Sequence, residues 1–126
     1  MIALDAGVLI AVLDASDIHH DAAVALLTEH ADEELVIGPI NLAEILVPAA
    51  QHGSEAELLA DIEALGVSAV PLPDDAALRL ARLRASSGVK MPDCCVLLTA
   101  EQTGSQVASF DERLRAAAAR RGIALV

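Results

Sequence analysis

The chain has 126 residues, of which 55% are hydrophobic, with one Phe, no Trp or Tyr, and a formal net charge of −11. This length suits a single domain over residues 1–126, which can bury roughly two-thirds of its unfolded surface around an aliphatic core. The acidic balance disfavours a protein that binds nucleic acid over its whole surface, and the scarcity of aromatic rings disfavours base-stacking.

The first elements alternate between short apolar runs and longer helical patterns. Residues 1–4 predict a buried strand, and residues 8–13 predict the helix that follows it. Ser16 or Asp17 is expected to cap a second helix that continues to about residue 30. The apolar run at 35–37, closed by Gly and Pro, predicts a second strand, so the chain starts with an α/β rhythm.

The middle of the chain continues this rhythm. Asn41 is expected to cap a third helix, in which Pro48 introduces a kink or an end because proline lacks a backbone donor and clashes with the preceding turn. A fourth helix is predicted over 55–65, and a third strand over 67–72.

The remaining elements complete an α/β fold with four to five strands. A helix opens at Pro73-Asp74-Asp75 and ends at Ser86-Ser87-Gly88. It is followed by a helix over 93–103, a strand over 106–109, a helix over 111–121 and a closing strand over 123–126.

Charge is distributed unevenly between the two halves. Residues 1–78 contain 15 Asp and Glu but no Lys or Arg, whereas the later residues carry all 8 bases and 4 acids, or 8 − 4 = +4. One face could therefore still bind phosphate, although solvated helix faces explain the same arginines equally well.

The cysteines and the hydropathy pattern indicate a cytoplasmic protein that does not enter the membrane. Cys94 and Cys95 are adjacent, a spacing that rarely forms a disulfide and matches no zinc motif, so both are interpreted as small core residues. No signal-like segment and no uninterrupted run of about 20 apolar residues is present.

Four acidic residues stand beside apolar sequence rather than in charged stretches: Asp5, Glu44, Asp93 and Asp111. A carboxylate in an apolar setting costs several kcal/mol unless it is paired, hydrogen-bonded or bound to a cation. The ends of parallel strands and the starts of the following helices meet at one edge of a sheet, where these acids are expected to converge. Carboxylate oxygens suit Mg²⁺ or Mn²⁺, so the sequence predicts a divalent metal site.

Each acid also has a purely structural explanation. Asp93 and Asp111 are predicted at helix starts, where capping and the helix dipole favour Asp, and Asp5 could cap the helix after it. Glu44 is the hardest to explain in this way, because only a capping box with Asn41 would account for it.

These motifs, in this order, resemble the PIN-domain ribonucleases, and within them the VapC-type toxins of bacterial type II toxin–antitoxin pairs. The resemblance spans nearly the whole chain and is carried by Met1-Ile2-Ala3-Leu4-Asp5, Asn41-Leu42-Ala43-Glu44, Met91-Pro92-Asp93 and Ser109-Phe110-Asp111. Two positions depart from the usual pattern, since Ala6 replaces a frequent Ser or Thr and Ser109 replaces a more usual Thr.

The resemblance implies a metal-dependent endoribonuclease with a PIN-like α/β/α sandwich around a parallel sheet. Asp5, Glu44, Asp93 and Asp111 would bind one or two Mg²⁺ ions, with Mn²⁺ as the alternative, and activate a water for attack on the phosphodiester. Ser109 would position a water or a carboxylate. Without metal the acids should repel one another and raise the pKa of at least one of them.

The RNA contacts and protein partners are expected from position and charge. Lys90, Arg113 and Arg115 are the bases nearest the acids in sequence and are the candidates for RNA phosphate contacts, although solvation or pairing with acids explains them as well. The resemblance further implies a homodimer and a small cognate antitoxin, whose inserted Arg would complement the acidic site. The four histidines show no zinc spacing and are interpreted as surface residues.

Two other classes of protein fit parts of the pattern. A nonenzymatic PIN-like scaffold would act through protein contacts, but its signature, the loss of one of the four acids, is missing. A response-regulator receiver domain shares the α/β rhythm, but it needs an acceptor Asp at the end of a central third strand, where this chain has Pro73 before Asp74.

Overall fold

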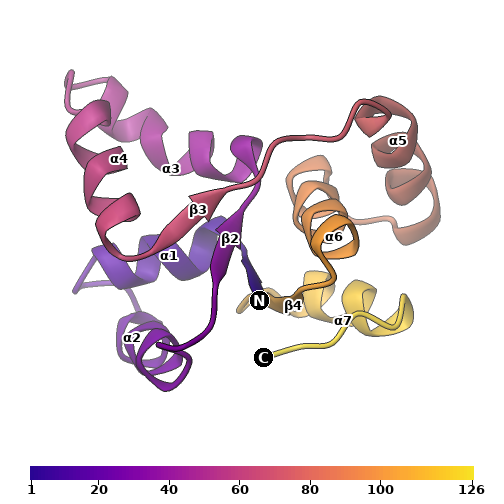
Figure 1. Ribbon diagram of the computed structural model, residues 1–126, viewed down its shortest axis with the longest axis horizontal. Coiled ribbons are helices and arrows are strands. Elements are labelled where there is room, and N and C mark those ends of the chain that lie inside the picture. Colours follow the sequence, from indigo (N-terminus) through magenta and orange to yellow (C-terminus); the bar gives the residue numbers. More distant parts are fainter.

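The computed structural model describes residues 1–126 and centres on a four-stranded parallel sheet (Figure 1). The strands are short: β1 (Ile2–Leu4), β2 (Leu35–Ile37), β3 (Val67–Ala69) and β4 (Gln106–Ala108). Their order is β3-β2-β1-β4, and all three strand pairs are parallel. The chain therefore steps outward from β1 on one side and returns to its other side with β4.

Seven helices cover both faces of this sheet. They are α1 (Ala6–Leu13), α2 (His20–Glu29), α3 (Pro39–Ala50), α4 (Glu55–Ala64), α5 (Ala76–Ser87), α6 (Met91–Thr103) and α7 (Glu112–Arg120). Figure 1 shows α1 to α4 on one side of the strands and α5 to α7 on the other. The predicted α/β/α sandwich is confirmed. None of the helices combines the length and apolar character that crossing a bilayer requires.

Two apolar layers arise because consecutive strand residues face opposite sides of the sheet. In β1, Ile2 and Leu4 join the core beneath α1 to α4, whereas Ala3 joins the core beneath α5 to α7. Strands β1 and β2 are buried on both faces, which explains their continuous apolar runs, whereas β3 at the sheet edge exposes Ser68 and Ala69. Fully burying one such aliphatic side chain contributes roughly 1.5–3 kcal/mol.

Several helix starts differ from the predictions. Helix α1 begins at Ala6 rather than residue 8, and α6 begins at Met91, so Asp93 lies in its first turn rather than at its start. Helix α2 begins at His20, because Asp14 and Asp17 form local turns instead: Asp14 accepts a hydrogen bond from the amide of Ser16 (2.9 Å), and Asp17 accepts one from the amide of His19 (2.8 Å). Asn41 does not cap α3, which begins at Pro39, and its side chain is buried instead.

Of the two effects predicted for Pro48, a kink or an end of the helix, the end is wrong. Pro48 lies inside the helix, which continues to Ala50. A proline in the last turn removes one backbone donor but is followed by only two further helical residues, so little of the helix depends on the missing bond.

Two strand predictions were too long by three residues, and those for β1 and β4 by one residue. Strand β3 ends at Ala69 rather than residue 72, because Pro71 and Pro73 have no amide hydrogen to offer a ladder. The closing strand is reduced to a single bridge between Val107 and Leu125. Strand β3 lies at the edge of the sheet, so the receiver interpretation, which requires it at the centre, is wrong.

Candidate metal centre

The carboxyl ends of β1 and β4 lie side by side, because these two strands are paired in parallel. Asp5 directly follows β1, and Ser109 directly follows β4. The amide of Asp5 donates to the carbonyl of Ala108 (3.0 Å), and the Ser109 hydroxyl donates to Asp5 Oδ2 (2.7 Å). After β1 the chain continues into α1 on one face of the sheet, and after β4 it continues into α7 on the other face. Open α/β sheets bind ligands at such a point, outside the carboxyl ends of the strands.

Ser109 also connects Asp5 to Asp111. Its side chain is buried, with 3% exposed, and its Oγ accepts a hydrogen bond from the amide of Asp111 (3.0 Å). One oxygen of Asp111 caps α7 by accepting from the amide of Leu114 (3.0 Å). The structural explanation of Asp111 is therefore correct for one carboxylate oxygen, and the other makes no hydrogen bond within the protein.

The four acids lie close enough for their charges to influence the ionisation of Asp93. Burial first, and then the negative charges of Asp5 and Asp111, raise the pKa of Asp93 to about 6, with a further small rise from Glu44. Lys90 acts in the opposite direction but does not compensate. Burial also raises the pKa of Asp5, although the Ser109 hydrogen bond opposes this rise. The direction of the predicted pKa rise is the one found, but burial contributes more to it than the repulsion that the prediction invoked.

Helix α3 is joined to the start of α6 by Asn41, a role that sequence patterns did not indicate. The amide group of Asn41, only 1% exposed, donates to the carbonyl of Pro92 (3.0 Å), next to Asp93. The approach is close, because a Cβ at Gly38 would lie 2.8 Å from Thr99 Oγ1 on α6. Glu44, exposed on α3, is thereby held near enough to contribute to the pKa of Asp93.

The donor set fits a hard divalent cation, although the side chains are not in coordinating positions. No group of three or more His, Cys, Asp and Glu side chains is arranged to hold a metal ion. The carboxylates nevertheless repel one another, because charges interact over about 10 Å, which is much longer than a bond between a metal ion and its ligand. Asp5 and Asp93 are only partly exposed, and their charged forms would be favoured by a cation. Direct coordination of one ion by three of these carboxylates would require them to move toward one another.

One wall of a cleft beside these acids is aromatic. The cleft is lined by Asp5, Gly7, Ile10, Asp17, His19, Phe110 and Asp111. The rings of His19 and Phe110 are stacked, with centroids 4.5 Å apart and planes inclined by 12°. The neighbouring His20, interpreted from sequence as a surface residue, is only partly exposed, with Nδ1 2.7 Å from the carbonyl oxygen of Ala11.

The three candidate RNA-binding bases lie in different settings. Lys90 is exposed and close enough to Asp93 to lower its pKa. Arg113 is exposed and lines a cavity between α7 and the end of α5. Arg115 is partly buried and donates to the carbonyls of Ser109 (3.2 Å) and Val126 (3.5 Å). These hydrogen bonds stabilise the backbone around Ser109 and occupy part of the guanidinium that a phosphate contact would need.

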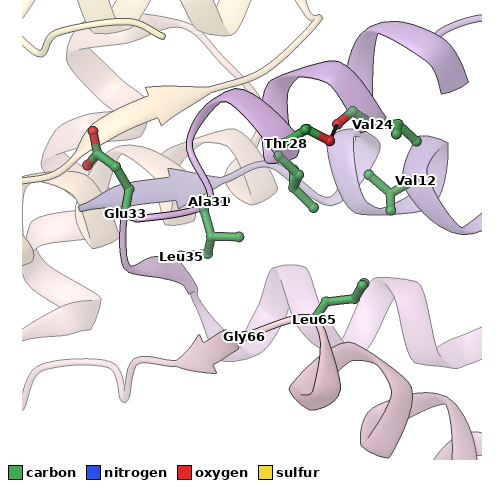
Figure 2. A pocket seen from close by; sticks show the side chains of 9 residues that line it. Val12, Val24, Thr28, Ala31, Glu33, Leu35, Leu65 and Gly66 are labelled. Atoms are coloured by element: carbon green, nitrogen blue, oxygen red, sulfur yellow. Dashed lines mark hydrogen bonds between the residues drawn. The ribbon is translucent and has the colours of Figure 1, made fainter.

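A separate apolar groove lies away from the acids. Figure 2 shows that side chains from α1, α2, β2 and the turn between α4 and β3 surround it, among them Val12, Val24, Leu35 and Leu65. None of the four candidate metal ligands lines this groove. Its chemistry suits apolar side chains of a partner rather than a phosphate.

The adjacent cysteines belong to the core, as predicted. Cys94 and Cys95 are free and buried, and the Cys94 thiol donates to the carbonyl of Val89 (3.7 Å). Burial raises the pKa of both thiols, which keeps them protonated and unreactive.

Comparison with known proteins identifies a family and a fold. The family model for the PIN domain matches residues 2–120. A comparison with curated protein sequences yields no match. VapC20 from Mycobacterium tuberculosis, described as a toxin that cleaves the sarcin–ricin loop, has a TM-score of 0.75 at 18% identity, covering 93% of this chain and 95% of that one.

Two further solved structures have the same fold. FitAcB from Neisseria gonorrhoeae has a TM-score of 0.72 at 23% identity, covering 99% of this chain and 96% of that one. A toxin–antitoxin complex from Klebsiella pneumoniae has a TM-score of 0.72 at 21% identity, covering 88% and 87%. At these identities the likeness concerns the arrangement of helices and strands.

Proposed function

Because this chain belongs to the PIN domain family, we propose that it is a metal-dependent endoribonuclease and the toxin of a type II toxin–antitoxin pair. The observation that carries the proposal is the meeting of Asp5 and Asp111 at the paired ends of β1 and β4, joined through Ser109. The pKa of Asp93, which burial and then the charges of Asp5 and Asp111 raise to about 6, supports it. An acid cluster whose charges are so poorly compensated is suited to receive a divalent cation.

Asp5, Glu44, Asp93 and Asp111 are the residues that would hold Mg²⁺, or Mn²⁺ in its place. When bound, such an ion polarises the scissile phosphate and lowers the pKa of the attacking water. Ser109 keeps Asp5 in position through its hydroxyl and is itself held by the amide of Asp111. Asn41 fixes the helix of Glu44 against the start of the helix of Asp93.

The substrate proposed is RNA with an exposed loop rather than RNA in general. Lys90, exposed and close enough to Asp93 to lower its pKa, and Arg113, exposed two residues after Asp111, are proposed to contact phosphates. Arg115 is proposed as a third contact, although it also donates to backbone carbonyls. The net charge of −11 repels RNA over most of the surface. That VapC20 is described as cleaving the sarcin–ricin loop supports a structured RNA loop as the target.

A small antitoxin is the proposed protein partner. An inserted Arg would satisfy the carboxylates of Asp5 and Asp93, for which Lys90 compensates only in part, and would compete with the metal ion. Apolar side chains of the same partner would fit the groove of Figure 2. The neighbour from Klebsiella pneumoniae is itself a toxin–antitoxin complex, which supports this assignment.

Homodimerisation is proposed on the basis of the family. Ile10 on α1 and Val47 on α3 are 40% and 53% exposed, and such apolar side chains would gain from burial between two copies. Sedimentation at several protein concentrations would detect the dimer, and a monomer at every concentration would refute it.

The nuclease is tested with purified, partner-free protein incubated with structured RNAs in Mg²⁺ or in EDTA. We expect cleavage only with Mg²⁺, and none by Asp5→Asn, which keeps an acceptor for the Ser109 hydroxyl but loses the charge. Asp61→Asn, an exposed acid on α4, is the matched control and should cleave normally. If the folded wild-type protein cleaves no RNA, the nonenzymatic scaffold becomes the better explanation.

A further inference from the structure

The single phenylalanine of the chain lies beside the candidate metal centre and not in the middle of the core. Phe110 is the only Phe, and there is no Trp or Tyr. Its ring is partly buried at the edge of the apolar layer under α1 to α4, and it also lines the cleft that contains Asp5 and Asp111. In a protein with an otherwise aliphatic core, this location indicates that the ring serves the cleft.

The ring of Phe110 is held by the same contacts that hold the acids. Its neighbours in sequence are Ser109, which donates to Asp5, and Asp111, whose amide donates back to Ser109. Arg115 also binds the carbonyl of Ser109 (3.2 Å). The position of the ring relative to the carboxylates is therefore fixed by hydrogen bonds on both sides.

The ring of His19 is brought to Phe110 by the segment between α1 and α2. The amide of His19 donates to Asp17 (2.8 Å), and the next residue, His20, is fastened to the carbonyl oxygen of Ala11 (2.7 Å). His19 itself is exposed, and it stacks on Phe110 at a centroid distance of 4.5 Å with an inclination of 12°. The pair forms a flat, preorganised surface that is open to solvent on the His19 side.

Core packing explains only part of this arrangement. It accounts for the contact of Phe110 with the apolar layer, which Leu could make equally well. It does not account for an exposed imidazole lying parallel to the ring at the mouth of the cleft.

We propose that the stacked pair of His19 and Phe110 is a nucleobase-binding platform, which takes an unpaired RNA base next to the phosphate held at the metal centre. This inference rests on the proposed ribonuclease function. Stacking on a flat π surface is available to every base and is typical of proteins that bind single-stranded RNA. The cleft wall favours a base over a phosphate, because Asp5, Asp17 and Asp111 surround the rings with negative charge.

The platform is tested by binding rather than by cleavage. The probe is a fluorescein-labelled oligouridine of about ten nucleotides, compared with an abasic oligomer that has the same phosphates but no bases. Ca²⁺ replaces Mg²⁺, because it supplies a hard cation for the carboxylates while its different size and geometry disfavour turnover. Fluorescence anisotropy then measures both dissociation constants for each protein variant.

We expect the wild-type protein to bind the oligouridine about 10-fold more tightly than the abasic oligomer, since stacking one base is worth roughly 1–3 kcal/mol. Phe110→Leu and His19→Ala should lose this preference and leave the affinity for the abasic oligomer unchanged. Phe110→Trp and His19→Phe, which retain a stacking surface, should keep it. His52→Ala, which removes an exposed imidazole in the turn between α3 and α4, is the matched control and should bind as the wild type does.

The outcomes separate this inference from the proposed function. Wild-type protein that binds both oligomers equally, or a preference that survives both Phe110→Leu and His19→Ala, would overturn the platform and leave the pair to a protein partner. If RNA is cleaved in a parallel assay with Mg²⁺, that result leaves the ribonuclease intact. A base preference lost in both variants supports the platform even if no cleavage is found, in which case only the nuclease proposal fails.

Discussion

Replacing Asp93 with Asn is expected to stabilise the metal-free protein. The pKa of this carboxyl is raised from 3.8 to about 6, and no hydrogen bond to its side chain contributes to the shift. A group whose pKa is higher in the folded state binds more protons when folded, so its charged form destabilises the fold as pH rises through this window. The penalty is absent below about pH 4 and complete above about pH 6.

The magnitude follows from the shift and two corrections. A rise from 3.8 to about 6 corresponds to about 3 kcal/mol without screening. Asp93 is only partly buried, so solvent screening reduces the penalty to about 1.5 kcal/mol. Asn also forgoes the favourable interaction of a negative charge with the first turn of α6, about 0.5 kcal/mol. The net gain at pH 7.5 is about 1 kcal/mol, or roughly 4 °C in Tm.

Urea and thermal unfolding in EDTA measure this difference at pH 7.5 and at pH 4. Asp93→Asn should be the more stable protein at pH 7.5, and the advantage should vanish or reverse at pH 4, where the wild-type carboxyl is largely protonated. Saturating Mg²⁺ should stabilise the wild type more than the variant, because binding to the folded state adds to stability. A variant that is less stable than the wild type at pH 7.5 in EDTA would refute the repulsion argument.

Three further predictions concern the same site. Mg²⁺ should raise the Tm of the wild type at pH 7.5 but much less at pH 5, because below about pH 6 protons compete with the ion for Asp93. An equal rise in Tm at both pH values in differential scanning fluorimetry would contradict this prediction. Asn41→Asp should lower the free energy of unfolding by about 3 kcal/mol or more, because it buries a charge against the carbonyl of Pro92. Asn41→Leu should cost less than about 1 kcal/mol, because it also removes the buried Oδ1 that has no partner. Similar urea midpoints for the two variants would be inconsistent with the contact. Gly38→Ala should lower the free energy of unfolding by about 1–3 kcal/mol, because its Cβ would lie 2.8 Å from Thr99 Oγ1. Adding Thr99→Ala should recover part of that loss, and no recovery in the double variant would place the strain elsewhere.

Sequence reasoning succeeded where a local pattern has one structural solution. The run at 35–37 became β2 with the predicted bounds, since a short apolar segment closed by Gly38 and Pro39 has few other uses. Asp5 and Asp111 were expected at strand ends, and parallel pairing of β1 and β4 brings those ends together. The charge interactions of all four acids follow from the same topology.

Sequence patterns did not predict the structure where competing local interactions or contacts between distant residues determine it. Asp14 and Asp17 form turns with their neighbours, which delays the start of α2. Asn41 looked like a helix cap, but its burial against Pro92 depends on how α3 packs on α6.

The cleft wall was missed for the same reason. Whether Phe110 lies in the core or faces a ligand depends on its meeting His19, a residue far away in sequence. The composition argued against base-stacking because it counted aromatic residues and carried no information on where the single Phe lies.

The most direct test is a Mg²⁺ titration of RNA cleavage under single-turnover conditions, with wild-type protein and Asp5→Asn side by side. We expect a saturable dependence on Mg²⁺ in the wild type and a loss of about 100-fold or more in the variant, with the urea midpoint in EDTA unchanged or raised. Cleavage that persists in EDTA, or equal rates for the two proteins, would show that the four carboxylates do not form the active metal centre.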